Sequence, residues 1–260
     1  MAKKRPTSSP VKNPLTPTVM TRIGGLRAGP SSPGDFSPDA DGTATFRIWT
    51  CYGHSHRSNA EMGELRIERT RRQTGQRLVI RQTLRNSGGK VHTIRATVSC
   101  GLDLLARPVS WTLTSEFSGE HMTGRGSLQV THAGGIEGNT WRDTVGGTTF
   151  ERKLAGPLTA DWCLFEAVQR MDFRARPPET FDVLEGLSVL KTAHRLDYRP
   201  KEAVTWGPEK IALHRFAQTG RGVYPYEYWL DDRHRLLLVT TGPRTYIRRP
   251  ERPKAEEHTT

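Results

Sequence analysis

Apolar and polar residues alternate one by one along most of this chain. Leu78, Ile80 and Leu84, for example, alternate with Arg77, Arg81 and Arg85. Successive side chains of a β-strand point to opposite faces, so this period predicts antiparallel strands with one buried and one solvent-exposed face. The same period recurs at 46–50, 64–68, 92–100, 128–130, 211–213, 224–230 and 236–239. We therefore expect a mainly β fold, a single β-rich domain over 44–248 that forms a curled antiparallel meander, or half-barrel, of eight to ten strands.

One segment, 159–171, does not alternate. It offers Thr159 as a helix cap and Asp161 for the first turn, and it contains neither glycine nor proline. Trp162, Phe165 and their apolar neighbours cover more of the helix surface than an ordinary amphipathic stripe does. This composition predicts one apolar helix that is buried on most sides, with the sheet curled around it.

The two ends of the chain differ from this central part in composition. Residues 1–43 hold seven of the 17 prolines, with many Ser, Thr and Gly residues between them. Such a segment buries too little apolar surface to offset the entropy of ordering, so we expect 1–43 and the tail 249–260 to be disordered. No apolar run approaches the ~20 residues of a transmembrane helix. No signal peptide is visible, which predicts a cytoplasmic protein, or a cell-envelope protein if the true start of translation differs.

The positive charge is concentrated in one part of the sequence. The chain has 39 Lys and Arg against 27 Asp and Glu, a net charge of +12, and residues 45–100 carry 11 basic and 3 acidic side chains. A Thr74-Gly75 turn would place Glu68 opposite Arg81 and Glu64 opposite Arg85, and the loop at 87–89 would bring Arg81 next to Arg95. The expected arginine face consists of Arg66, Arg77, Arg81, Arg85 and Arg95.

Two interpretations of the arginine face remain open. It is either a solvated, partly salt-paired surface of the sheet or a binding surface for nucleic acid or another polyanion. Proteins that bind single strands place aromatic side chains among the basic ones, and only Trp49 is available for stacking here. The sparse aromatic content of this region favours the first interpretation.

The sequence contains no recognisable catalytic motif, so we expect no enzymatic activity and no cofactor. His54 and His56 would point the same way in a strand, but no third ligand lies near them, and we expect no metal site. Cys51, Cys100 and Cys163 form no CxxC pair. They are expected to be small buried side chains, although a Cys51–Cys100 disulfide is conceivable in an exported protein.

An aromatic run near the end of the domain offers a candidate binding surface. Tyr224, Tyr226 and Tyr228 would lie on one side of a strand. They either pack in the core and cover an edge, or they line a cavity in the mouth of the curled sheet together with Trp162 and Phe165 of the helix.

The segment 228–236, Tyr-Trp-Leu-Asp-Asp-Arg-His-Arg-Leu, resembles a hairpin of bacterial proteins with the curved-sheet lipoprotein-carrier (LolA/LolB-like) fold and of related uncharacterised envelope proteins. His234 stands where glycine is more usual in that hairpin. The resemblance implies a half-barrel that holds an acyl chain or a similar apolar group without catalysis. It assigns no individual ligand residue.

These observations lead to two functional hypotheses. The first is a non-enzymatic bacterial protein that binds a lipid or another apolar or amphipathic small molecule in the concave face of its curled sheet. The alternative is an interaction with nucleic acid or another polyanion through the arginine face of residues 45–100. The sequence does not indicate an oligomeric state.

Overall fold

The structure is a computed structural model that describes residues 15–30, 36–51, 59–85, 89–119, 127–174, 177–220, 223–242 and 244–250. The first eight strands are β1 (Gly42–Cys51), β2 (Asn59–Arg72), β3 (Gly75–Arg85), β4 (Val91–Cys100), β5 (Pro108–Ser118), β6 (Ser127–Glu137), β7 (Thr140–Val145) and β8 (Thr148–Lys153). The others are β9 (Leu158–Ala160), β10 (Phe181–Glu185), β11 (Val189–Trp206), β12 (Glu209–Thr219), β13 (Tyr226–Leu230), β14 (Leu236–Thr241) and β15 (Arg244–Arg248). The helices are α1 (Pro17–Arg22) and α2 (Asp161–Arg170).

In the described residues, all fifteen strands belong to one sheet in the order β8-β7-β6-β5-β4-β3-β2-β1-β15-β14-β13-β12-β11-β10-β9. Neighbouring strands are antiparallel, except that β9 pairs with β10 in parallel. The mainly β, curled-sheet architecture is confirmed, whereas the expected number of eight to ten strands is wrong. Short turns with glycines at positive φ, such as Gly138, Gly146 and Gly207, divide the chain into more hairpins than the alternation alone reveals.

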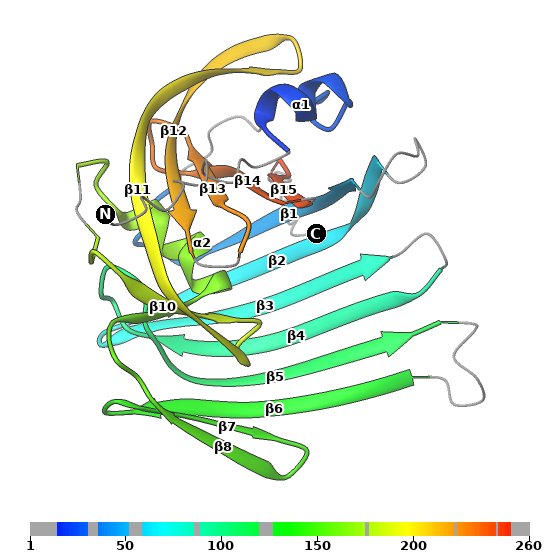
Figure 1. Cartoon of the computed structure of the whole chain (residues 1–260). Coiled ribbons are helices and arrows are strands. Elements are labelled where there is room, and N and C mark those ends of the chain that lie inside the picture. Colours follow the sequence, from blue (N-terminus) through cyan, green and yellow to red (C-terminus); the bar gives the residue numbers. More distant parts are fainter. Residues whose placement is uncertain are drawn as a thin grey trace, which may run out of the picture.

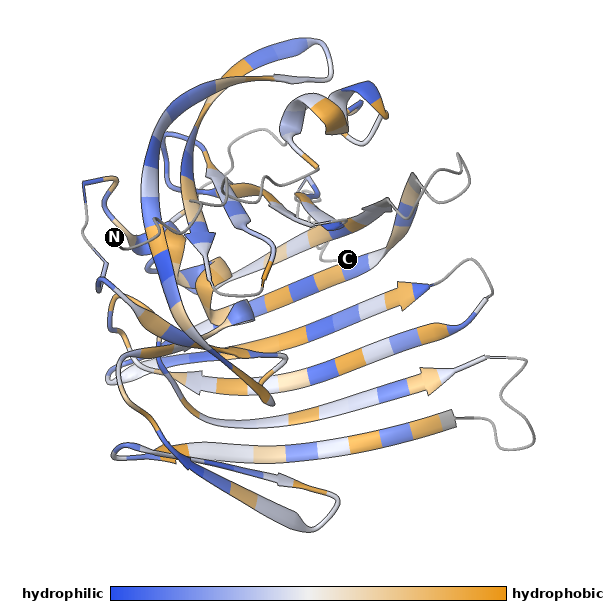
Figure 2. Cartoon of the chain, viewed as in Figure 1, coloured by the Kyte–Doolittle hydropathy of each residue, from blue (hydrophilic) through white to orange (hydrophobic). Residues whose placement is uncertain are grey.

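The sheet curls around α2, which lies inside the curve (Figure 1). Eight of the ten residues of α2 are buried, so the prediction of an apolar central helix is confirmed. Thr159 does not cap the helix, because it belongs to β9 and the N-cap residue of α2 is Ala160. Its hydroxyl instead donates to the carbonyl oxygen of Leu105 at 2.6 Å. The strands carry alternating hydrophobic and hydrophilic residues along β2 to β6 (Figure 2), as the sequence period predicts.

The hairpin between β2 and β3 has a register that differs from the predicted one. Arg72 pairs with Gly75, so the turn residues are Gln73 and Thr74, and Glu68 lies opposite Val79. Gly75 belongs to the strand because the backbone of β4 passes close to it. A Cβ there would lie 2.5 Å from the carbonyl oxygen of Cys100. The shift is two residues, so every side chain keeps its predicted face.

Part of the segment 1–43, for which the sequence predicts disorder, has regular structure and buried side chains. Residues 15–30 contain α1, which begins at Pro17 and is capped by Thr16. Leu15, Met20 and Leu26 are buried in a second hydrophobic cluster. They pack against residues from β11 to β15: Val204, Trp206, Leu213, Trp229, Leu237, Leu238 and Ile247. Residues 1–14, 31–35 and most of the tail, 251–260, lie outside the described residues.

Candidate functional site

Three of the five predicted aromatic side chains are part of the packed core. Trp162, Phe165 and Tyr228 are each at most 4% exposed. The ring of Phe165 makes edge contacts with Phe46 and Tyr246, at centroid distances of 5.5 and 5.3 Å. Packing of α2 against the sheet accounts for these three residues, and the other two, Tyr224 and Tyr226, line a cavity described below.

Helix α2 covers only one end of the concave face. Ten helical residues span about 15 Å, whereas the 11 residues of β3 span roughly 36 Å. In Figure 1, α2 lies toward the left of the sheet, and β2 to β6 continue beyond it to the right. The concave surface at that far end therefore receives no cover from α2.

A cavity of about 280 Å³ lies at this far end, and we call it the loop-end cavity. Strands β1 to β5 and the segment before β4 supply its lining: Thr50, Met62, Leu84, Arg85, Lys90, Val91, His92 and Phe117. Leu84, His92, Phe117 and Leu128 are directly paired across four neighbouring strands. Phe117 is 44% exposed and Leu128 is 55% exposed, so this row continues the core as an open apolar surface.

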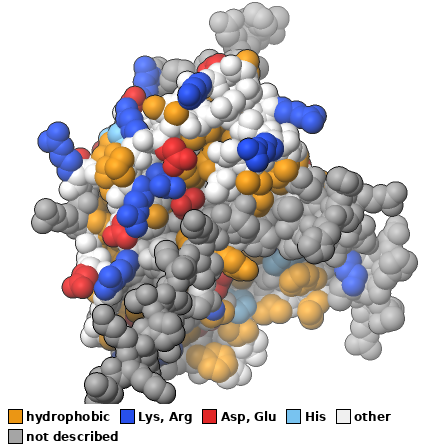
Figure 3. All heavy atoms as spheres, turned by 45° about the horizontal axis from the view of Figure 1, so that its top comes forward, with side chains coloured by type: hydrophobic (Ala, Val, Ile, Leu, Met, Phe, Trp, Pro, Cys, Tyr) orange, Lys and Arg blue, Asp and Glu red, His pale blue; other side chains and the backbone are white. Residues whose placement is uncertain are grey.

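A histidine and several cations border the apolar row. His92 stacks on Phe117 with ring centroids 3.9 Å apart, and its Nε2 lies 2.9 Å from the hydroxyl of Ser115. Burial, with a smaller contribution from the nearby Arg244, lowers the pKa of His92, so the ring is neutral at pH 7. Arg85 and Lys90 also line the cavity. Figure 3 shows hydrophobic and histidine side chains together on the lower part of the visible face.

A second cavity, of about 230 Å³, lies beside the beginning of α2, and we call it the His194 pocket. Its lining comes from α2, from β10 to β14 and from the segment before β13: Asp161, Val183, Glu185, Lys191, His194, Gln218, Val223, Tyr224, Tyr226 and Thr241. Tyr224 and Tyr226 are candidate ligand-binding residues from sequence, whereas His194 has no pattern in the sequence that assigns it to a site. Its partners come from strands distant in sequence.

Asp161 has the most perturbed carboxyl group of this pocket. Its Oδ1 accepts a hydrogen bond from the backbone N–H of Trp162 at 2.9 Å, and its Oδ2 accepts one from Gly186 at 3.1 Å. Desolvation by the surrounding protein outweighs these two bonds and raises the pKa of Asp161 to about 7. At neutral pH this carboxyl group is therefore present in both protonation states.

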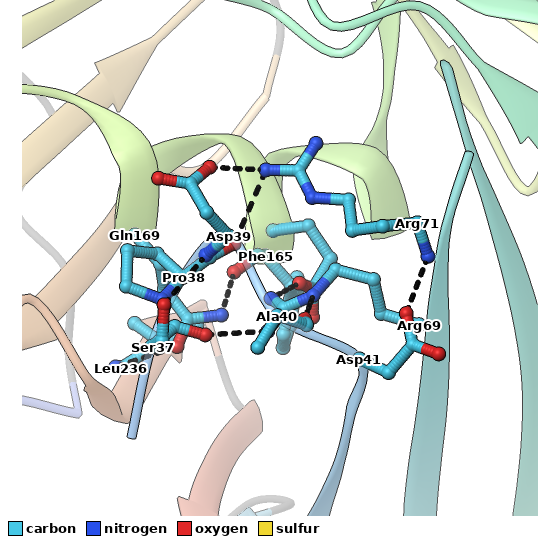
Figure 4. Close-up of polar contacts among 11 residues, drawn as sticks. Ser37, Pro38, Asp39, Ala40, Asp41, Arg69, Arg71, Phe165, Gln169 and Leu236 are labelled. Carbon is cyan, nitrogen blue, oxygen red and sulfur yellow. Dashed lines mark hydrogen bonds and ion pairs between the residues drawn. The ribbon is translucent and has the colours of Figure 1, made fainter. Parts of the chain in front are cut away.

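A third cavity, of about 560 Å³, lies beside the segment 36–44. Arg69 lines this cavity, and each of its three guanidinium nitrogens has a partner. Nε donates to the carbonyl oxygen of Ala40, Nη2 donates to that of Ser37, and Nη1 pairs with Glu166 of α2. Figure 4 shows this segment held between β2 and α2. The buried charges of this cavity fasten the N-terminal segment to the sheet and the helix.

The arginine face exists as a row of side chains across three strands. Arg66 pairs with Arg81, and Arg81 pairs with Arg95, which confirms the predicted neighbourhood of Arg81 and Arg95. Carboxylates accompany these arginines: Glu68 lies 2.9 Å from Arg66 and 3.8 Å from Arg81, and Glu116 lies 3.9 Å from Arg95. Arg77 pairs with Ser99 at the other end of β3, and Arg85 borders the loop-end cavity.

The cysteine and histidine predictions have different outcomes. Cys100 and Cys163 are buried free thiols. His54 and His56 lie outside the described residues, within which no cluster of three His, Cys, Asp or Glu residues has metal-binding geometry. None of the helices in the described ranges is long and apolar enough to cross a membrane.

Comparisons with known proteins support the fold alone. No family model matches the chain, and no curated protein matches it. Among solved structures, it is similar to a β-barrel-like protein of a domain of unknown function, DUF1849, from Brucella abortus. The TM-score is 0.53 at 9% sequence identity, over 81% of this chain and 96% of the other. This likeness supports a curled-sheet fold, which the resemblance to lipoprotein carriers also implies. A specific relation to those carriers remains a prediction.

Proposed function

We propose that this protein binds an amphipathic ligand, an acyl chain with an anionic head group, in the loop-end cavity. The observation that carries the proposal is the open apolar row on the concave face, which α2 does not reach. Monomeric proteins rarely leave contiguous apolar surface open to water without a use for it. A concave, mainly apolar cavity with a few polar groups is the usual form of a small-molecule site.

The charges around the cavity favour an anionic head group. Arg85 and Lys90 line it, and the electrostatic influence of Arg244 reaches His92. These cations attract a carboxylate, while Leu84, Val91 and Phe117 contact its apolar chain. The ligand class and the concave face are those expected from the sequence. The residues of the proposed site differ from the aromatic residues that the sequence suggested.

The proposal is tested by extraction and by a fluorescent probe. Organic extraction of the purified protein followed by mass spectrometry is expected to find a bound lipid or fatty acid. cis-Parinaric acid, a fluorescent fatty acid, is expected to bind saturably and more tightly than its methyl ester, because the ester lacks the charge that the cations attract. Absence of both extracted lipid and parinaric acid binding would refute the proposal.

A matched pair of variants locates the site. Phe117→Glu places a carboxylate on the cavity wall and is expected to weaken parinaric acid binding by about tenfold or more, since 1.4 kcal/mol corresponds to a factor of ten. Phe150→Glu makes the same change at a similarly exposed phenylalanine of β8 that does not line this cavity. Equal losses in the two variants would show that the probe binds elsewhere.

A further inference from the structure

The His194 pocket contains a buried ring nitrogen that has no hydrogen-bond partner among the described residues. His194 is 3% exposed, and its Nε2 makes no hydrogen bond to any part of the chain that the structure describes. Buried polar groups in native proteins are nearly always paired with protein, water or a ligand. Since His194 lines the pocket, an occupant of the pocket is the natural partner for Nε2.

A chain of hydrogen bonds determines which ring nitrogen carries the proton. The hydroxyl of Tyr228 donates to Oε1 of Gln218 at 2.7 Å, which turns the amide nitrogen of Gln218 toward Nδ1 of His194 at 3.0 Å. An amide nitrogen only donates, so Nδ1 accepts and the neutral ring carries its hydrogen on Nε2. Burial lowers the pKa of His194, which keeps the ring neutral. The pocket therefore presents an imidazole N–H to its occupant.

The backbone of β11 is distorted where it presents this histidine. The pairing of β10 with β11 shifts register between Phe181 and Val183, and Ala193 has a φ of 59°. Such a bulge redirects the side chain that follows it. It allows Lys191 and His194, three residues apart in one strand, to line the same pocket. Gly220 lies so close to the His194 ring that a Cβ at this position would be 2.9 Å from Nε2.

The opposite wall offers hydrogen-bond acceptors and an aromatic ring. Each oxygen of the Asp161 carboxylate accepts one backbone N–H, which leaves further lone pairs for hydroxyl donors of a ligand. Tyr224 is 53% exposed and lies over Gly242, where a Cβ would be 2.9 Å from the tyrosine ring. The ring thus lies close to the backbone of Gly242, and the residue lines the pocket.

The charges of the pocket disfavour an ionic ligand. Lys191 and Glu185 form an ion pair at 3.6 Å and largely neutralise each other. An anion would face the carboxylates of Asp161 and Glu185, and a cation would face the imidazole N–H. The volume of about 230 Å³ corresponds to roughly eight waters at about 30 Å³ each, which is the size of one small organic molecule.

We propose that the His194 pocket binds a neutral, polyhydroxylated small molecule of the size of one sugar ring. In this arrangement a ligand oxygen accepts the hydrogen of His194 Nε2, ligand hydroxyls donate to the Asp161 carboxylate, and the apolar face of the ring stacks on Tyr224. This site is separate from the loop-end cavity, with which it shares no lining residue, so it does not depend on the function proposed above.

The test uses single sugars as probes and the His194 ring as the reporter. Long-range proton–nitrogen spectra of the labelled protein are expected to show His194 protonated on Nε2. Titration with glucose, galactose or mannose is expected to move the Nε2 resonance saturably for at least one of the three. A shift produced only by glucosamine would make the pocket a cation site, and a shift produced only by glucuronate would make it an anion site. Either outcome overturns the proposal, as does the absence of any shift.

Variants of the exposed Tyr224 keep the proposal testable without altering the core. Tyr224→Ala is expected to weaken binding of the responding sugar by about fivefold, the equivalent of about 1 kcal/mol of aromatic contact. Tyr224→Phe keeps the ring and is expected to bind as the unmodified protein does. Phe150→Ala, which removes an exposed ring outside the pocket, is the matched control. If Tyr224→Ala binds the sugar unchanged, the proposed stacking is wrong.

Discussion

The sulfur atom of Cys163, in helix α2, lies 3.4 Å from that of Cys100 at the end of β4. Both thiols are buried, and their mutual hydrogen bond together with burial raises the pKa of Cys163. Cys51 ends β1 at the opposite end of the sheet, where it pairs with Asn59. Ten residues of strand separate the two ends by about 30 Å. The Cys51–Cys100 disulfide considered from sequence is therefore excluded, since bridged Cα atoms lie within about 7 Å.

We expect diamide, a thiol oxidant, to join Cys100 and Cys163 in a disulfide. Each thiol loses a hydrogen atom, the sulfurs form one bond, and diamide takes up both hydrogens. The reaction should be slow, because burial disfavours the thiolate. Closing a loop of 63 residues is expected to raise the free energy of unfolding by up to about 4 kcal/mol. Peptide mapping by mass spectrometry identifies the bond, and Cys163→Ser should abolish it. Recovery of a Cys51 disulfide instead would contradict this geometry.

The ion pair between Arg69 and Glu166 predicts unequal effects of single and double substitutions. Both side chains are at most 5% exposed. Arg69→Leu leaves Glu166 buried without its cation and is expected to lower the free energy of unfolding by about 3–5 kcal/mol. In the double variant Arg69→Leu, Glu166→Leu, part of this loss should be recovered because no charge remains buried. Urea unfolding of both variants measures the difference, and a double variant less stable than Arg69→Leu alone would disprove this explanation.

The packing of α1 predicts that the N-terminal segment contributes to the stability of the whole domain. Met20 is fully buried, and its sulfur accepts a hydrogen bond from Thr245 of β15. Met20→Ala is expected to cost about 2–5 kcal/mol, as for other large-to-small changes in a core. Val19→Ala, a change in the same helix at a partly buried side chain, is the control and should cost less. Equal thermal stability of Met20→Ala and the unmodified protein would show that α1 is not part of the cooperative unit.

Asp161 predicts a specific pH dependence of stability. Its pKa is about 7 in the folded protein, against 3.8 for an ordinary aspartate. Between these values the folded state binds more protons than the unfolded state, so stability falls as the pH rises from about 4 to 7. Three pKa units correspond to roughly 4 kcal/mol, an upper bound because part of the side chain is open to the pocket. A ¹³C titration of the Asp161 carboxyl should show a midpoint near 7, and Asp161→Asn should reduce the slope of stability against pH. A midpoint near 4 would contradict the prediction.

Glu68 allows a direct test of the arginine face as a polyanion surface. Replacing it by Gln removes the carboxylate beside Arg66 and Arg81, at a stability cost below about 1 kcal/mol for an exposed pair. If polyanions bind this face, Glu68→Gln should elute from heparin at higher salt than Glu151→Gln. The latter raises the net charge equally but lies on β8, beside Arg142. Identical elution of the two variants would indicate that this face does not contact heparin.

The sequence permitted the fold class and the central helix to be predicted because both depend on local periods. The alternation in β3 and β4 marks the buried face, and the wide apolar surface of 161–170 marks a helix enclosed by protein. The register of β2 with β3 was missed by two residues. The position of the turn depends on Gly75 lying against the backbone of β4, a contact between strands that no single hairpin contains.

The residues of the two proposed sites were harder to predict because they meet only through the curl of the sheet. Leu84 and Phe117 follow the same apolar–polar alternation as ordinary core residues. They border a cavity because α2 does not extend to their end of the sheet. His194 has no sequence signal of its own, since its hydrogen-bond partner Gln218 comes from β12 and Asp161, which lines the same pocket, comes from α2. The tyrosine run, by contrast, was identified from sequence, but its members divide between the core and the pocket wall.

The sequence by itself determined which face of each strand is apolar, where the helix lies and where the excess positive charge is carried, because these are properties of neighbouring residues. Only the tertiary structure decided what those faces enclose. The curl brings α2 against one half of the concave surface and brings Cys163 to Cys100. It leaves the His194 pocket beside the beginning of the helix and the loop-end cavity at the far end of the strands. These outcomes depend on lengths and contacts between distant segments, which a local pattern does not contain.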